Sequence, residues 1–147
     1  MRAGSGGAIR CRYRTRRSGA GRGGPVTSSN DPTAHAEIVA IHTACRDPGD
    51  FRLTDATLHT SCEPRPMCLS AAYRARVSRT VYAGQRTDAA AAGFDDFIYR
   101  EIPVPPHART IPAAQMLAEE ARAVFDEWNS QTGQDPALRR LLRPSQR

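Results

Sequence analysis

The chain has 147 residues, enough for one domain with a buried core and too few for two domains of ordinary size. Its formal net charge is +6, but residues 1–30 contain seven arginines and no acidic residue, so the other 117 residues carry a net charge of −1. A nearly neutral body argues against a nucleic-acid partner. No apolar run approaches the roughly 20 residues that a membrane-spanning helix needs, so we expect no membrane partner.

The N-terminal region gives no sign of secretion or of a regular fold. The four cysteines lack the spacing of a disulfide framework, and no apolar segment resembles a secretory signal, so we expect a cytoplasmic protein. Residues 1–25 are rich in Gly, Arg and Ser and show no periodicity, which predicts a disordered basic tail without strands. A targeting peptide is the alternative, although the segment has no amphipathic helical pattern.

The first regular elements are expected after this tail. A helix should begin at Asp31-Pro32, where an N-cap acceptor precedes a proline suited to the first helical position. Apolar residues then recur at helical spacing as far as Cys45, and Asp-Pro-Gly at 47–49 ends the helix. Residues 57–60 are expected to form a short strand.

Strands and helices continue to alternate along the chain, which predicts an α/β domain. After the strand at 57–60 we expect a helix over 66–77, a strand over 79–83 and a short helix over 89–92 that is capped by Asp88. A proline-rich loop over 102–112 follows, with an edge strand near Ile111. A long helix over 113–129 and a helical turn over 137–142 complete the expected elements. The long helix has an apolar stripe from Leu117 to Trp128, which we interpret as a core or dimer contact.

Residues suited to a metal site stand at the starts of two expected helices. His35 and Glu37 fall in the first turn of one helix and Cys68 in the first turn of the next. The positive end of a helix dipole favours a thiolate over a thiol. Catalytic zinc takes three protein ligands and keeps one position open, and His35 and Cys68 can supply two of the three. Glu37 is placed to move a proton from water to a leaving amine.

The order of these residues matches, with one change, the H-x-E and P-C-x-x-C signature of zinc-dependent nucleobase deaminases. HAE stands at 35–37 and PRPMC at 64–68, so Arg65 occupies the position of the first cysteine. Arginine stays protonated and cannot bind zinc. Cys62 is an imperfect replacement, because it lies six positions from Cys68 where the signature has three.

Between about residues 26 and 131 the chain resembles bacterial guanine deaminases of the cytidine-deaminase-like fold. The resemblance rests on NDPTAHAEIVAI at 30–41, TSCEPRPMCLSA at 60–71 and, most specifically, TDAAAAGFDDFIYREI at 87–102. It implies hydrolysis of guanine to xanthine and ammonia by a homodimer. The residues that the resemblance carries over are His35, Cys68 and the position of Arg65 as zinc ligands, Glu37 as the proton shuttle, and Ala36 and Asp96 as contacts to the purine.

The resemblance also implies a fold and a domain organisation. A three-layer α-β-α sandwich is expected in a deaminase-like domain at 26–135, between the tail at 1–25 and a basic C-terminal end at 136–147. Members of the family begin with a helix and two strands that we do not find in this sequence, so the sheet is expected to lack its N-terminal strands. Gly24 stands where the family has an asparagine that holds the purine.

Each candidate residue also has an ordinary structural interpretation. His35 fits a helix cap, Glu37 fits an acid that stabilises a helix start by about 0.3–1 kcal/mol, and Asp96 fits a turn. Because Arg65 weakens the zinc site, two other functions stay open. One is a catalytically inactive, deaminase-like scaffold, and the other is an RNA-associated protein that uses its arginine-rich tail.

Overall fold

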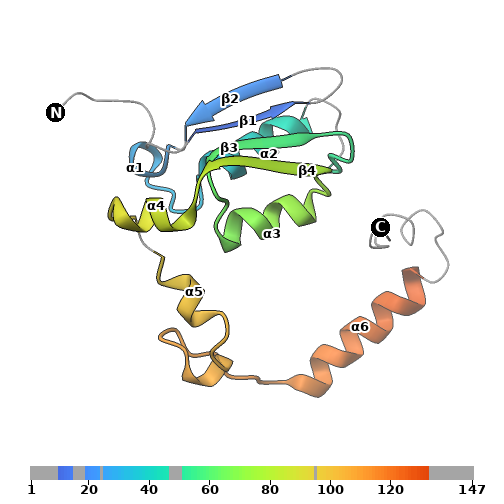
Figure 1. The fold of residues 1–147 in the computed structure, drawn as a ribbon. Helices are drawn as coiled ribbons and strands as arrows, with labels where there is room; N and C mark the ends of the chain where they lie inside the picture. Colours follow the sequence, from blue (N-terminus) through green and yellow to red (C-terminus); the bar gives the residue numbers. More distant parts are fainter. Residues whose placement is uncertain (1–9, 15–18, 24, 47–50, 95, 133–147) are drawn as a thin grey trace. The chain divides into compact units, whose positions relative to one another are not determined.

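The computed structural model describes residues 10–14, 19–23, 25–46, 51–94 and 96–132. The chain forms two compact units, Met1–Arg100 and Glu101–Arg147, and each is described by itself (Figure 1). The predictions made for Gly24, for a helical turn over 137–142 and for a basic end at 136–147 lie outside the described residues.

The first unit is built on a four-stranded sheet with the strand order β2-β1-β3-β4 (Figure 1). The strands are β1 (Arg10–Arg14), β2 (Gly19–Gly23), β3 (Thr57–Cys62) and β4 (Arg79–Gly84). β1 pairs antiparallel with both β2 and β3. β3 and β4 run parallel with a helix between them, so their carboxyl ends lie at the same edge of the sheet.

The prediction that the sheet lacks N-terminal strands is wrong. Residues 10–14 and 19–23 form a hairpin that extends the sheet beyond β3. In β1, RCRYR, two residues of apolar type, Cys11 and Tyr13, alternate with arginines over only five positions, whereas β2, GAGRG, has none of the apolar alternation by which strands are recognised. Strands pair through backbone N–H and C=O groups, and every residue of these two segments supplies both, so the ladder forms without that pattern.

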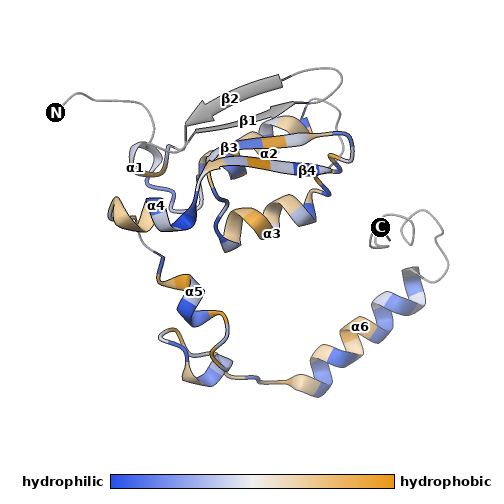
Figure 2. Cartoon of the chain, in the orientation of Figure 1, coloured by the Kyte–Doolittle hydropathy of each residue, from blue (hydrophilic) through white to orange (hydrophobic). Residues whose placement is uncertain are grey.

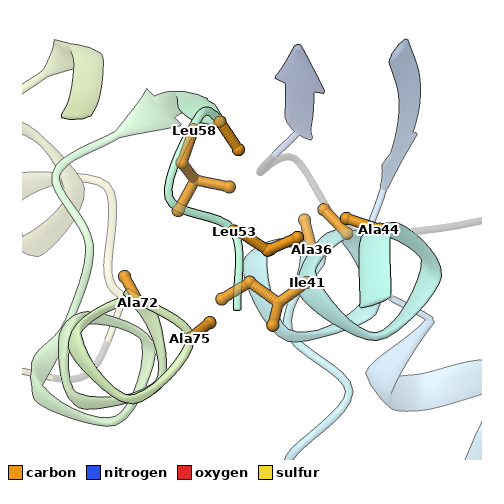
Figure 3. Close-up of a cluster of buried hydrophobic side chains, with 9 residues drawn as sticks. Ala36, Ile41, Ala44, Leu53, Leu58, Ala72 and Ala75 are labelled. Carbon is orange, nitrogen blue, oxygen red and sulfur yellow. The ribbon is translucent and has the colours of Figure 1, made fainter. Parts of the chain in front are cut away.

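The core of this unit lies between β3 and the two helices α2 (Ala36–Arg46) and α3 (Pro66–Arg74) (Figure 3). Ala36, Ala40 and Ala44 recur every fourth residue and form a buried stripe of small side chains on α2. Leu58 of β3 is buried in the same cluster. The other buried members are Ile41, Leu53, Ala56, Ala72 and Ala75.

Burial alternates along β3, as expected of a strand covered on one face. Leu58 and Thr60 are buried, whereas His59 and Ser61 on the opposite face are exposed. Parallel strands joined by a helix, with helices packed on the sheet, confirm the predicted α/β class.

Helix α2 begins later than predicted. A single turn, α1 (Val26–Ser29), comes first and ends at Asn30, whose φ of 52° is left-handed. The Asp31 carboxylate then accepts hydrogen bonds from the hydroxyl of Thr33 at 2.6 Å and from its N–H at 2.8 Å, and these two bonds hold the pKa of Asp31 below its ordinary value. The acid that we expected to cap the helix therefore closes a turn, and α2 starts only at Ala36.

The later helices of the first unit agree with the predictions in part. α3 starts at the predicted residue and ends three residues before the predicted end. α4 (Arg86–Ala91) begins three residues early, because Gln85 and Asp88 form a capping box at its start. The turn α5 (Ile98–Glu101) has no counterpart among the predictions.

The second unit contains a 3₁₀ turn, η1 (Pro106–Ala108), and the long helix α6 (Ala118–Thr132). α6 begins five residues later than predicted, and the expected edge strand near Ile111 does not form. Apolar and polar residues mix along α6 in Figure 2, and its apolar side chains Val124, Phe125 and Trp128 are exposed. No helix in the described part of the chain is long and apolar enough to cross a membrane.

Candidate active site

The amino ends of α2 and α3 come together and place His35 against Cys68. His35 is the last residue before α2, and its carbonyl accepts the hydrogen bond from the N–H of Val39 at 3.0 Å that opens the helix. Cys68 lies in the first turn of α3, as predicted, and is fully buried. The Nδ1 atom of His35 lies 3.4 Å from the Sγ atom of Cys68.

Glu37, in the first turn of α2, completes a group of three side chains. One ligand atom from each of His35, Glu37 and Cys68 lies within 4.8 Å of the other two. In the described part of the chain, this is the group of His, Cys, Asp or Glu residues that could hold a metal ion. Glu37 is 2% exposed and His35 is half-buried, so the group is largely shielded from solvent.

The carboxylate of Glu37 is only partly satisfied by the protein. Its Oε2 atom is buried and has no hydrogen-bond partner among the residues that the structure describes. A buried polar atom without a partner costs about 1–3 kcal/mol, and a charged one costs more. Such an atom in a folded protein calls for a catalytic role or for a water or ion that pairs with it.

Arg65 is the N-cap residue of α3 and stands outside this group. Its backbone is extended, with φ −70° and ψ 165°, and its carbonyl accepts a hydrogen bond from the N–H of Leu69 at 2.8 Å. Cys62, at the end of β3, also lies outside the group, with its Sγ 3.8 Å from the carbonyl oxygen of Gln85. Neither residue therefore supplies a third ligand atom beside His35 and Cys68.

The two predicted purine contacts have different surroundings. The methyl group of Ala36 is 1% exposed and packs in the core, which leaves only the backbone of this residue for a ligand (Figure 3). Asp96 is half-buried just before α5, and its Oδ1 lies 3.8 Å from Nη2 of Arg100 in a largely exposed ion pair. The structure does not bring Asp96 into the His35–Glu37–Cys68 group.

Sequence reasoning missed a contact between the loop after β3 and the helices that follow β4. Glu63 donates its N–H to the carbonyl of Gly84 at 2.8 Å, and its Oε2 accepts the N–H of Arg86 at 3.0 Å. The guanidinium of Arg86 lies 4.5 Å from the centre of the Tyr99 ring. Burial and then the charge of Glu63 raise the pKa of Tyr99, while Arg86 and Arg65 act to lower it. No spacing in the sequence links these residues.

Comparison with known proteins identifies the family. Residues 7–84, more than half of the chain, match the model described as the cytidine and deoxycytidylate deaminase zinc-binding region. This chain belongs to the cytidine and deoxycytidylate deaminase family. The matched range includes the β1–β2 hairpin, His35, Glu37 and Cys68, so the predicted site falls within a zinc-binding region of known type.

Within the cytidine and deoxycytidylate deaminase family, the chain is similar to guanine deaminases. It is 54% identical over 106 residues to guanine deaminase of Bacillus subtilis (strain 168), which covers 71% of this chain and 68% of the relative. The X-ray structure of guanine deaminase from Bacillus subtilis matches with a TM-score of 0.81 and 48% identity, over 87% of this chain and 83% of that chain. A guanine deaminase structure from Nitrosomonas europaea matches with a TM-score of 0.55 and 29% identity, over 85% and 74% of the two chains. These matches confirm a cytidine-deaminase-like α/β fold.

Proposed function

We propose that this chain is a guanine deaminase that hydrolyses guanine to xanthine and ammonia at the His35–Glu37–Cys68 group. The observation that carries the proposal is the buried, unpaired oxygen of Glu37 beside a His–Cys pair at two helix N-termini. The 54% identity to a guanine deaminase supports guanine as the base.

The residues present fit a zinc ion through two ligands. Bonds of about 2.0 Å to nitrogen and about 2.3 Å to sulfur at a tetrahedral ion separate the two ligand atoms by about 3.5 Å, close to the 3.4 Å between Nδ1 of His35 and Sγ of Cys68. The third ligand is lacking, because Arg65 is protonated and bears no donor lone pair. When bound, zinc would lower the pKa of a water molecule and so supply a nucleophile at neutral pH.

Glu37 would perform the proton transfers. Its unpaired Oε2 accepts a proton from the water that attacks C2 of guanine. The same proton then passes to the 2-amino group, the C2–N bond breaks and ammonia leaves. The proton that remains on the new hydroxyl moves to N3 of the ring, so that the new C–O bond becomes the carbonyl of xanthine. Burial keeps bulk water away from this carboxylate, so the proton goes to the substrate and not to solvent.

Recognition of the purine is assigned to Asp96 and to the backbone of Ala36. The Asp96 carboxylate would accept a hydrogen bond from an N–H of the base. Its ion pair with Arg100 is 3.8 Å long and largely exposed, and exposed pairs of this kind contribute little. The carboxylate therefore remains available to a ligand.

We infer that turnover is slow because of Arg65. Partners that merely orient metal ligands lower metal affinity by about 10–100-fold when they are lost, and a missing ligand should cost at least as much. Arg65 also brings a positive charge into the motif that would hold the cation. The chain should accordingly bind zinc weakly and deaminate guanine slowly.

We also propose a homodimer and a three-layer sandwich. In the second unit, Val124, Phe125 and Trp128 present an exposed apolar stripe on α6, a feature typical of a surface that another protein covers. We assign a second copy of the chain to such a surface. In the first unit, His59 and Ser61 mark an open face of β3 on which a further helical layer can pack.

The deciding experiment follows xanthine formation from guanine by the unmodified chain and by Arg65→Cys, each with and without Glu37→Gln. We expect slow turnover by the unmodified chain, faster turnover by Arg65→Cys, and a rate about 10²–10⁴-fold lower in each chain when Glu37 is replaced. A folded, zinc-loaded Arg65→Cys variant that forms no xanthine would instead favour an inactive scaffold. RNA binding by the full chain that falls steeply as salt is raised, without guanine turnover, would favour the RNA-associated alternative.

A further inference from the structure

The segment that carries Asp96 is connected to the zinc-binding motif through a residue outside the candidate site. Arg86 is the first residue of α4, two positions after the end of β4. Its backbone N–H donates to Oε2 of Glu63 at 3.0 Å, and its guanidinium lies 4.5 Å from the centre of the Tyr99 ring in α5. One residue thus contacts both the loop after β3 and the helix after Asp96.

Glu63 fixes the loop side of this connection. It donates its N–H to the carbonyl of Gly84 at 2.8 Å while its carboxylate accepts the N–H of Arg86. These two bonds join the ends of the parallel strands β3 and β4, and α/β proteins bind ligands at this edge of the sheet. The same loop leads directly through Arg65 to Cys68, so it has a fixed place relative to the His35–Cys68 pair.

Tyr99 fixes the other side. Its N–H donates to the carbonyl of Asp96 at 3.1 Å, and its ring lies beneath the Arg86 guanidinium. A planar guanidinium stacks on an aromatic face by cation–π attraction, which lysine reproduces less well. The exposed Asp96–Arg100 pair adds little restraint of its own. The Arg86–Tyr99 stack is therefore a main restraint on where Asp96 lies.

We propose that Arg86 is a positioning residue for guanine: by stacking on Tyr99 it holds residues 96–100 against the loop 62–66, and so keeps Asp96 in place beside the base. The choice of guanine rests on the proposed function. The assignment to Arg86 goes beyond it, because Arg86 touches neither the ligand group nor the Asp96 carboxylate in the contacts described.

The first test measures the restraint without any turnover. Arg86→Ala removes the guanidinium but keeps the backbone bond to Glu63. We expect amide hydrogen exchange in a peptide over 96–101 to accelerate by about tenfold, with α2 unaffected. Arg74→Ala, at an exposed arginine near the end of α3, is the matched control and should leave exchange unchanged. Arg86→Lys should be intermediate, and equal protection in Arg86→Ala and Arg74→Ala would overturn the proposal.

The second test measures the dissociation constant of guanine by calorimetry in two backgrounds with little turnover, Glu37→Gln and Glu37→Gln with Arg65→Cys, and measures KM and kcat in the same chains with Glu37 restored. We expect Arg86→Ala to weaken binding by about tenfold and to raise KM by the same factor while kcat changes little. A merely structural role would lower the thermal midpoint and leave guanine affinity at the Arg74→Ala level, and that result would overturn the proposal.

The two proposals fail in different ways. If guanine binding weakens in Arg86→Ala but no variant forms xanthine, deamination fails and the positioning role stands. If xanthine forms and Arg86→Ala binds guanine as well as Arg74→Ala does, the positioning role fails and deamination stands. No guanine binding in either background would overturn both.

Discussion

Glu37 combines burial, ionisable chemistry and an oxygen without a partner among the described residues. An acid that served only to stabilise the start of α2 would lie on the surface, where the helix dipole acts on it without a desolvation cost. The position of Glu37 next to His35 and Cys68 instead suits an acid that exchanges a proton with a ligand. The two interpretations of Glu37 therefore differ in what they predict for Glu37→Gln. A purely structural acid predicts a loss of stability, and a catalytic acid predicts a loss of rate.

Glu37→Gln should lower the initial rate of xanthine formation by about 10²–10⁴-fold, the usual contribution of a general acid or base. It should not lower the thermal midpoint, because glutamine keeps the shape and removes a buried charge. The pair of measurements is a rate assay and a thermal melt on the same preparations. A variant that loses stability yet keeps its rate would assign Glu37 to the helix alone.

Arg65 is the residue at which this chain departs from the deaminase signature, and zinc content measures the effect directly. We expect the purified chain to carry well under one zinc per chain by atomic spectroscopy, and Arg65→Cys to approach one, because the new thiolate completes three ligands. Arg65→Ser removes the positive charge without adding a thiolate, so its zinc content separates the effect of the charge from the effect of the missing ligand. Zinc near one per chain in the unmodified protein would contradict a deficient site.

At the scale of elements, the sequence predicted those features that depend on local chemistry. Proline at the first position of α3 placed Cys68 in the first helical turn, and the structure agrees. The start of α2 was misplaced because Asp31 has two local uses, a helix cap or a turn closed by Thr33, and the sequence does not distinguish them. The contact of Arg86 with Tyr99 joins residues that only the fold brings together.

The packing of α2 and α3 on β3 rests on three large side chains, Ile41, Leu53 and Leu58, among many alanines. Leu58 is 1% exposed and lies in the cluster formed by both helices (Figure 3). Leu58→Ala should lower the free energy of unfolding by about 2–5 kcal/mol, because it removes buried methyl groups and leaves a cavity in the cluster. His59→Ala, one residue along on the exposed face of β3, is the control and should change it by less than about 0.5 kcal/mol. Urea denaturation of both variants gives the free energy of unfolding for a change on the buried face of β3 and for one on its exposed face.

At the scale of the whole molecule, the residues that we assign to chemistry all belong to the first unit. The family match over residues 7–84 covers the ligand group and the complete described sheet. Asp96 lies within the same unit, close to its end. The second unit contributes none of the proposed catalytic residues, which is consistent with our assigning it to assembly.

The β1–β2 hairpin decides whether residues 1–25 are a dispensable tail or a part of the domain. β1 lies between β2 and β3, so removing the hairpin would turn β3 into an edge strand with unpaired N–H and C=O groups. Leu58 and Thr60 belong to that same strand, and both are buried. Removing the hairpin should therefore destabilise the buried core of the first unit as well as the edge of the sheet.

We expect a chain that lacks residues 1–25 to lose its cooperative thermal transition and to aggregate, as judged by circular dichroism and gel filtration. A chain that lacks only residues 1–9 keeps both strands and is the matched control, which should unfold as the full chain does. Faster amide exchange in 57–62 of the longer deletion would locate the damage at β3. If the longer deletion melts at the same temperature as the control, the hairpin adds nothing to stability. That result would contradict the conclusion that residues 10–14 and 19–23 are a stabilising part of the domain.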